Sequence, residues 1–389
     1  MTFHTLFSKP MGNPLAVERD GSCVPVPGLE VAQAPWVARA PARDLLCPPA
    51  TAVLVVEVSP RMHVQLRSPW MFAAAIAIAG WTNPAAAATS SAGAISLTFG
   101  PSTRGEAMGG LYLAEANDYA ARWSNPGGLA FVDRPVVGTM FTQLVPGLAD
   151  DVYYFFGGWV LPTQSIGTLQ FDMTYLSYGK SEATSDDNMS LGTFSSYELS
   201  PSVSLGFKFL PNLGLGVSAK YVRIDLAPAS VLPDFAGSGS GTGTTWAFDL
   251  GSQYRADKFR LGSVLSNLGP NISFIDDQQS DPLPTTLRLG GMYDIYSDEV
   301  SQLRAGYEFE QALPSLEVIG KPVHHIGSEF VYANTFALRA GWVVDKDGAI
   351  EGLAGGFGVT WKNATFEYAT VPQAAELDRP SRFALWLRY

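Results

Sequence analysis

Apolar and polar side chains alternate along most of the chain after residue 136, with turn residues between the alternating stretches. From Leu213 to Tyr221 every second residue is apolar, and those between are glycine, serine or lysine. Successive side chains of a β-strand point to opposite faces, so this period of two predicts strands with one apolar face. We expect fourteen strands, at 136–143, 151–160, 167–178, 197–209, 213–223, 244–254, 258–267, 285–294, 301–310, 325–332, 335–343, 352–361, 364–370 and 381–389.

The connections between these strands alternate in length. The tight ones are 210–212, 255–257, 333–334 and 362–363, and the long ones are 179–196, 224–243, 268–284, 311–324 and 371–380. Outer-membrane barrels have short periplasmic turns and longer extracellular loops. Residues 136–389 are therefore predicted to form an all-β, transmembrane antiparallel outer-membrane β-barrel of about 14 strands. The alternative is a soluble all-β sandwich or propeller of the periplasm, which needs no aromatic belts.

Aromatic side chains gather at the ends of the expected strands, where the girdles of a membrane barrel belong. The chain also ends on Tyr389, in a strand of alternating apolar residues that resembles the C-terminal recognition strand of outer-membrane barrels. Both features favour the membrane barrel over the soluble alternative. The expected girdle residues are Tyr153, Tyr154, Phe155, Phe156, Trp159, Tyr175, Tyr178, Trp342, Trp361 and Tyr368.

One compact segment, 107–130, precedes the strands and is rich in Gly and Ala. It has helix-like pieces around Asn117 and Asp118 and a Ser-Asn-Pro-Gly-Gly turn at 124–128. We expect residues 89–135 to form an N-terminal linker and hatch. The segment 107–130 is the part of this region that could fill a barrel lumen. Its turn could be a hinge or a static turn, since Gly permits backbone states that other residues avoid. The hatch positions singled out are Met108, Gly109, Gly110, Asn117, Asp118, Asn125, Pro126, Gly127 and Gly128.

If the apolar faces meet lipid, the opposite faces place charges of both signs in the lumen. Buried charges must be paired, so a mixed set favours a filled interior over a polar conduit, which is the alternative. The expected lumen charges are Asp249, Arg288, Arg304, Glu308, Glu310, Glu329, Arg339, Glu367, Arg382 and Arg388.

The most apolar window lies at 62–88, where Arg67 is followed by an apolar core at 70–81 and a run of alanines. This three-part order is that of a secretory signal peptide, with cleavage near Ala87 or Ala88. We expect Sec-dependent export to a Gram-negative type of outer membrane. Residues 1–61 are then a misassigned or unstructured extension, the alternative being a long leader or cytoplasmic tail. Both cysteines, Cys23 and Cys47, fall in this extension.

The composition excludes some functions and gives no sign of catalysis. The formal net charge is −11, so the chain has no excess of positive charge to neutralise phosphates. We therefore expect no nucleic-acid partner. No catalytic, cofactor or metal site is predicted: 237–241 has Gly at the nucleophile position of a hydrolase elbow. His324 and His325 are adjacent and would point to opposite faces of a strand. Acidic loop residues could bind divalent cations or be merely solvated: Asp150, Asp151, Asp186, Asp187, Asp276 and Asp277.

Several of these stretches together resemble the PorV/PorQ family, a branch of the FadL-like outer-membrane barrels. Its N-terminal signature is similar to 107–110, 117–118 and 123–130, although Ser-Asn-Pro-Gly-Gly stands here where Asn-Pro-Ala-Gly is usual. Further similar stretches follow in order, among them 246–251, 266–269, 287–290, 338–342, 366–369 and 382–385.

The resemblance implies a fourteen-stranded barrel with its N-terminal segment inside as a hatch. It implies a component of type IX secretion that binds protein cargo and works with other secretion components, with outer-membrane lipid around the wall. We expect cargo to contact the loops 224–243 and 268–284. FadL-type relatives imply the alternative, a channel for hydrophobic small molecules.

Overall fold

The computed structural model describes residues 15–17, 23–25, 93–163, 165–184, 189–227, 241–274, 280–313, 320–374 and 377–389. The chain divides into two units, 1–82 and 83–389. In the first, β1 (Leu15–Val17) pairs antiparallel with β2 (Cys23–Pro25). The expected signal peptide at 62–88 lies outside the described residues, as do the cysteine Cys47 and the start of the linker.

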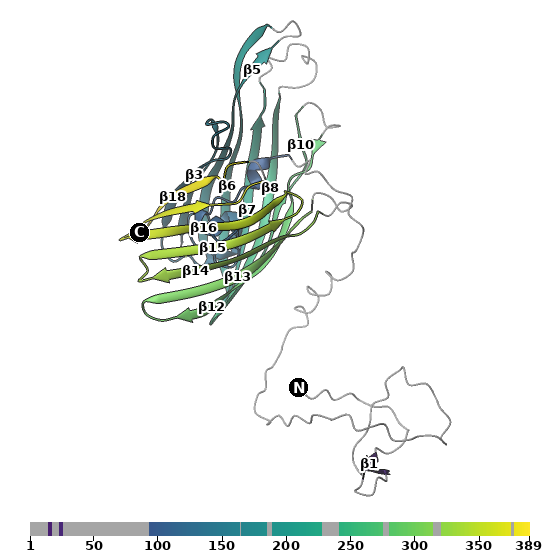
Figure 1. Ribbon diagram of the computed structural model, residues 1–389, viewed down its shortest axis with the longest axis vertical. Helices are drawn as coiled ribbons and strands as arrows, with labels where there is room; N and C mark the ends of the chain where they lie inside the picture. Colours follow the sequence, from purple (N-terminus) through teal and green to yellow (C-terminus); the bar gives the residue numbers. More distant parts are fainter. Residues whose placement is uncertain are drawn as a thin grey trace, which may run out of the picture. The chain divides into compact units, whose positions relative to one another are not determined.

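The second unit is a closed antiparallel barrel of fourteen strands, which confirms the predicted fold class (Figure 1). Each strand pairs with its neighbour in the chain, β9 pairs with β12, and β18 pairs with β3 to close the wall. The strands are β3 (Val136–Gln143), β4 (Val152–Pro162), β5 (Thr168–Thr184), β6 (Ser190–Leu210), β7 (Leu213–Asp225), β8 (Thr242–Ala256), β9 (Phe259–Leu268), β12 (Thr286–Ser297), β13 (Ser301–Ala312), β14 (Val323–Tyr332), β15 (Phe336–Asp345), β16 (Ile350–Trp361), β17 (Ala364–Thr370) and β18 (Ser381–Arg388).

The expectation of a long loop at 179–196 was wrong, because most of that stretch continues β5 and β6. These two strands pair beyond a register shift at Gly179, which has a positive φ of 84°, and they rise past their neighbours (Figure 1). The stretch is rich in Ser, Thr and Gly and carries little alternation, so backbone hydrogen bonds rather than an apolar face hold it together. The connection 269–285 likewise contains a short pair, β10 (Ile272–Ser273) and β11 (Ser280–Asp281).

The two ends of the barrel differ in their connections. At one end lie the start of β3, the end of β18 and short links, of which 211–212, 257–258 and 362–363 have two residues each. The opposite end carries 226–241, 269–285 and 371–380. By the rule for outer-membrane barrels the short-turn end is periplasmic and the other end is extracellular.

The outer face of the wall is apolar. Along β15 the exposed and buried residues alternate, with Phe336, Leu338 and Trp342 outward, and β18 exposes Phe383 and Leu385 in the same way. A water-soluble protein does not expose so continuous an apolar band, whereas lipid requires one. The soluble alternative is therefore wrong. Among the described residues, no helix is both long and apolar enough to cross a membrane.

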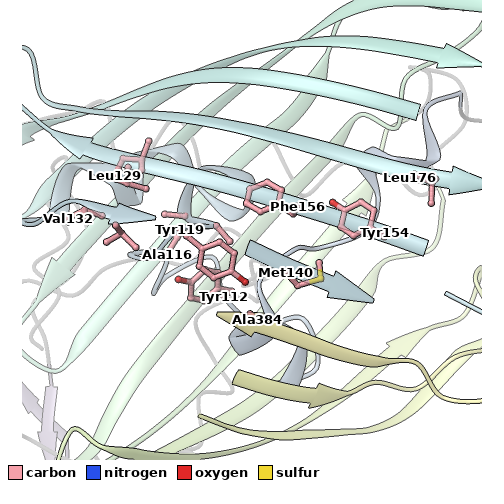
Figure 2. Close-up of a cluster of buried hydrophobic side chains, with 14 residues drawn as sticks. Tyr112, Ala116, Tyr119, Leu129, Val132, Met140, Tyr154, Phe156, Leu176 and Ala384 are labelled. Atoms are coloured by element: carbon pink, nitrogen blue, oxygen red, sulfur yellow. The ribbon is translucent and has the colours of Figure 1, made fainter. Parts of the chain in front are cut away.

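Three of the expected girdle aromatics, Tyr154, Phe156 and Tyr178, face the lumen instead. Tyr154 and Phe156 are fully buried in the lumen, where they pack with Tyr119 and Met140 in the main apolar cluster (Figure 2). Tyr178 packs against the main apolar cluster, and its hydroxyl donates to the buried carboxylate of Glu198. The run Tyr-Tyr-Phe-Phe at 153–156 is aromatic on both faces, so alternation could not say which pair points to lipid. Tyr153 and Phe155 face outward, and Tyr153 contacts the ring of Tyr175 there.

Candidate functional site: the hatch and the lumen

Four short helices form the hatch inside the barrel: η1 (Ile95–Leu97), α2 (Thr103–Ala107), α3 (Ala121–Ser124) and η2 (Pro126–Phe131). Two of them begin with side-chain caps. The Ser102 hydroxyl accepts the backbone N–H of Gly105 at 3.1 Å, and the Asn125 Oδ1 accepts that of Gly127 at 2.9 Å. These caps satisfy helix N–H groups that would otherwise have no partner. The turn at 124–128 is therefore the start of η2.

Glycines of the wall let the hatch lie directly against the strands. A Cβ added at Gly216 in β7 would overlap the carbonyl of Pro126, and one at Gly341 in β15 would overlap the carbonyl of Met108. One at Gly158 in β4 would overlap the backbone of the hatch at Tyr119. The backbones of hatch and wall are thus in contact at separate points around the lumen.

The predicted hatch glycines lie in close backbone contacts. Gly109 and Gly110 have positive φ of 73° and 94°, and a Cβ at Gly109 would come within 2.9 Å of the Trp342 nitrogen. A Cβ at Gly127 would meet the Ser252 Cα at 2.8 Å, and one at Gly128 would overlap the Ala116 carbonyl. A side chain at any of these four positions would separate hatch from wall or distort the hatch itself.

Asn117 and Asp118 connect α2 to α3 and take part in hydrogen bonds at the periplasmic side. The Asn117 side chain accepts from Arg104 at 3.2 Å, and its carbonyl accepts from Arg388 at 3.0 Å. Asp118 accepts the N–H of Ala120 at 2.8 Å. The two residues therefore hold the hatch chain in place between its helices.

The structure places the ten expected lumen charges on the inner side of the wall and brings most of them into ion pairs. Arg304 and Glu310 remain partly accessible, as does Arg388, and the other seven are at most 9 % exposed. The buried seven are Asp249, Arg288, Glu308, Glu329, Arg339, Glu367 and Arg382.

The centre of these interactions is Glu329 in β14. Its two oxygens accept from Arg104 of the hatch at 2.8 and 2.6 Å, and Arg339 of β15 donates to it at 2.8 Å. A bidentate guanidinium–carboxylate pair is among the strongest side-chain contacts. Arg339 also pairs with Glu367 at 3.0 Å. One buried charge network thus connects the hatch to strands β14, β15 and β17.

A second carboxylate of the hatch, Glu115, meets arginines of the wall. It lies 2.9 Å from Arg260, 3.2 Å from Arg304 and 3.6 Å from Arg104. Because Arg260 lies on β9 and Arg304 on β13, Glu115 connects the hatch to these two strands. The two networks share Arg104 and Arg304.

Three further pairs lie nearer the extracellular side. Arg288 pairs with Glu308, whose other oxygen accepts the backbone N–H groups of Tyr112 and Leu113 at 3.2 Å each. Arg382 donates to the carbonyl of Gly100 and lies 3.4 Å from Glu106. Asp249 lies 2.7 Å from Lys220 and 3.7 Å from Arg122 of the hatch. Each of these three pairs therefore either includes a hatch side chain or is hydrogen-bonded to the hatch backbone.

Sequence reasoning missed the charges that the hatch itself contributes. Arg122, only 1 % exposed, pairs with Asp172 of β5, and neither residue was singled out. Arg104 and Glu115 were missed as well. A signal was present, because a charge inside a Gly- and Ala-rich segment expected to be buried requires a partner on the wall.

Two buried phenols of the hatch stay neutral. Burial raises the pKa of Tyr112 well above its ordinary value, and it does the same for Tyr119. The Tyr119 hydroxyl donates to the carbonyl of Pro101 at 3.1 Å. Neither ring thus supplies charge to the lumen at neutral pH.

The adjacent histidines point to opposite faces of β14. The Nδ1 of His325 lies 2.6 Å from the carbonyl of Gly109 inside, whereas His324 stacks on Tyr307 outside. Within the described ranges no three His, Cys, Asp or Glu side chains are grouped to hold a metal. Of the acidic loop residues, Asp151 accepts the N–H of Lys180 at 2.8 Å. Asp186, Asp187, Asp276 and Asp277 lie outside the described residues, as does most of 237–241.

Replacing Asn125 by Ala tests whether the turn before η2 is held or free to hinge. The Asn125 side chain caps η2 and donates to the carbonyls of Leu113 at 3.1 Å and Ser252 at 2.8 Å. Its loss leaves buried groups unpaired, so we expect destabilisation of about 1–3 kcal/mol in chemical unfolding. Asn271→Ala, which loses one exposed hydrogen bond to Ser280, is the matched control. Equal stability of the two variants would show an unconstrained hinge.

Two cavities flank the hatch. One of about 440 Å³ opens at the extracellular end and is mostly apolar, with Phe99, Trp123, Leu144, Leu176 and Val371 among its lining residues. The other, of about 520 Å³, lies at the periplasmic end and is lined mainly by polar and charged side chains. The two share no lining residue, and fully buried hatch residues such as Ala107 and Met108 line neither.

Residues 85–316 match the family model described as type IX secretion system protein PorV. The chain belongs to this family. Its closed barrel and apolar outer face accordingly make it an outer-membrane protein of the PorV type. A search of curated proteins returned no match.

Several solved structures are similar to this PorV-family chain. The toluene transporter TbuX of Ralstonia pickettii has a TM-score of 0.48 at 16% identity, over 75% of this chain and 98% of that one. The toluene transporter TodX of Pseudomonas putida has a TM-score of 0.45 at 15% identity, over 73% and 95%. The monoaromatic hydrocarbon channel CymD has a TM-score of 0.48 at 12% identity, over 75% and 97%.

Proposed function

We propose that this protein binds protein cargo at its extracellular end, for secretion or attachment at the cell surface, and works there with other secretion components. One observation carries the proposal: the hatch fills the lumen and is bound to the wall by buried ion pairs and backbone contacts. A barrel closed in this way is suited to presenting a surface rather than to conducting solutes. The match to the PorV family supports the same reading.

The extracellular end offers the surface that such a role needs. The β5–β6 hairpin projects there, and several apolar side chains at this end are exposed, among them Leu148 of the connection 144–151 at 76 % and Leu191 of β6 at 45 %. We propose that these side chains form part of the surface that contacts cargo. Of the two loops expected to contact cargo, residues 228–240 and 275–279 lie outside the described residues.

The proposal is tested by purifying the tagged protein from outer membranes of its own cell and identifying co-purified secreted proteins. We expect a variant with Ser in place of Leu148, Leu191 and Leu377 to recover several-fold less cargo. Each substitution removes exposed apolar contact area. The matched control is a variant with Ser in place of Ile166, Leu210 and Val300. These three side chains are similarly exposed, at the periplasmic end. No secreted protein with the wild type, or equal losses in both variants, would contradict cargo binding at this end.

The apolar extracellular cavity favours a second candidate, a channel for hydrophobic small molecules. Such a channel needs an apolar path past the hatch, and the cavity reaches the hatch at Phe99 and Trp123. Uptake of a labelled fatty acid by a deletion strain and by the complemented strain tests it. Unchanged uptake on deletion would eliminate this candidate.

Export by a signal peptide at 62–88 is part of the proposal. The Arg, apolar core and alanine run of that window support it. We expect the outer-membrane form to begin near Thr89, after cleavage at Ala87 or Ala88. N-terminal sequencing of the purified protein checks this, and a chain that retains residues 1–61 would refute the cleavage.

A further inference from the structure

The periplasmic cavity, called here the periplasmic vestibule, is basic although the chain as a whole carries a charge of −11. Its lining includes six basic and three acidic side chains: Arg104, Arg134, Arg304, Arg339, Lys362 and Arg388, against Asp118, Glu329 and Glu367. A basic cavity in an acidic protein requires an explanation, because the average surface charge does not produce it.

The charges fall into two layers. Deep in the vestibule Arg104, Arg304 and Arg339 are paired with carboxylates of the hatch and the wall, as described above. At the mouth Arg134 and Lys362 are exposed and Arg388 is half-buried, and no carboxylate of the described residues lies within ion-pair distance of them. The excess of positive charge therefore lies at the mouth, where a partner from the periplasm would enter.

Hydrogen-bond donors in the vestibule wall also lack partners. The Nη1 of Arg339, whose side chain is 5 % exposed, is buried without an acceptor among the described residues, and so are the Nε of Arg388 and the Nε1 of Trp386. Buried donors in folded proteins nearly always have an acceptor, so these donors are free to bond to water or to an acceptor of a bound group. Carboxylate oxygens are acceptors only and match both these donors and the exposed cations.

We propose that the periplasmic vestibule binds an acidic peptide segment of a periplasmic protein, with carboxylates meeting Arg134, Lys362 and Arg388 at the mouth. The volume of about 520 Å³ holds a few side chains, and the cavity lies at the end of the barrel that periplasmic proteins reach. Peptide amides add hydrogen bonds to the Asn and Thr side chains of the rim, such as Asn363 and Thr335. The proposal goes beyond cargo binding at the extracellular end and does not depend on it.

The test uses the full protein in lipid nanodiscs and a fluorescein-labelled octaglutamate, with octaglutamine as the uncharged probe. We expect octaglutamate to bind more tightly, with an affinity that falls as salt is raised, because exposed charges are screened. Changing Arg134, Lys362 and Arg388 to Gln is expected to weaken binding about tenfold, as for the loss of three exposed ion pairs. None of the three belongs to an ion pair of the hatch, although Arg388 donates one hydrogen bond to the carbonyl of Asn117.

The matched control changes Lys208, Arg223 and Lys321 to Gln, since these three cations lie outside the vestibule lining. This variant is expected to bind octaglutamate like the wild type. Equal binding of the two peptides, or equal weakening in both variants, would overturn the proposal. Displacement by free citrate at the same carboxylate concentration would overturn the assignment to a peptide and indicate a small anion.

Discussion

Adding one methyl group at each of two wall glycines is expected to release the hatch. In the variant Gly216→Ala with Gly341→Ala, the new Cβ atoms would overlap the carbonyls of Pro126 and Met108. Both neighbours are backbone and cannot rotate away, so each overlap costs about 1–3 kcal/mol. The hatch should then leave its site while the strands, whose ladders are unchanged, remain closed.

Limited trypsin digestion measures this release. The hatch contains Arg104 and Arg122, whose side chains are 12 % and 1 % exposed in the wild type, and we expect cleavage there to accelerate more than about tenfold in the variant. The matched control is Gly157→Ala with Gly355→Ala, where a Cβ meets nothing closer than 3.7 and 3.8 Å. Cleavage at the wild-type rate in the Gly216 and Gly341 variant would show that the backbone contacts do not hold the hatch.

Removing the charge of Glu329 is expected to have the second large effect. Glu329→Gln keeps the shape of the side chain but leaves Arg104 and Arg339 without their shared carboxylate. Breaking a buried ion pair by removing one partner costs about 3–5 kcal/mol, because the remaining charge stays buried. Guanidinium unfolding in detergent micelles should show a loss of this size.

Two comparisons identify the cause of that loss. Asp225→Asn breaks the exposed pair with Arg223, at 3.1 Å, and is expected to cost at most about 1 kcal/mol. Adding Arg104→Met to Glu329→Gln removes one of the uncompensated cations and should recover part of the stability. If the double variant is less stable than Glu329→Gln alone, unpaired charge is not the origin of the effect.

The strands of the barrel could be predicted because lipid imposes a strict period of two. Residues such as Leu338 and Leu385 must face outward wherever a wall crosses the membrane, so the pattern fixes most strand positions to within a few residues. The upper parts of β5 and β6 have no lipid to face. Their Ser- and Thr-rich sequence therefore resembles a loop, and only the paired backbones show the strands.

The sequence predicted that the lumen is filled, but it did not predict which charged side chains pair with each other there. Mixed charge on the inner faces indicated a filled interior, yet the bond between Arg104 and Glu329 joins residues 225 positions apart. Which carboxylate meets which arginine depends on how the hatch lies against the wall, and that is set by contacts such as those at Gly341. The orientation of Tyr154 and Phe156 was undetermined for a related reason, since both faces of their strand are aromatic.

The conductance of the purified protein in planar lipid bilayers shows whether the hatch seals the barrel. The structure predicts that the wild-type protein inserts without opening a stable pore, while the Gly216 and Gly341 variant conducts once its hatch is displaced. A steady open conductance from the wild-type protein, equal to that of the variant, would contradict a sealed lumen.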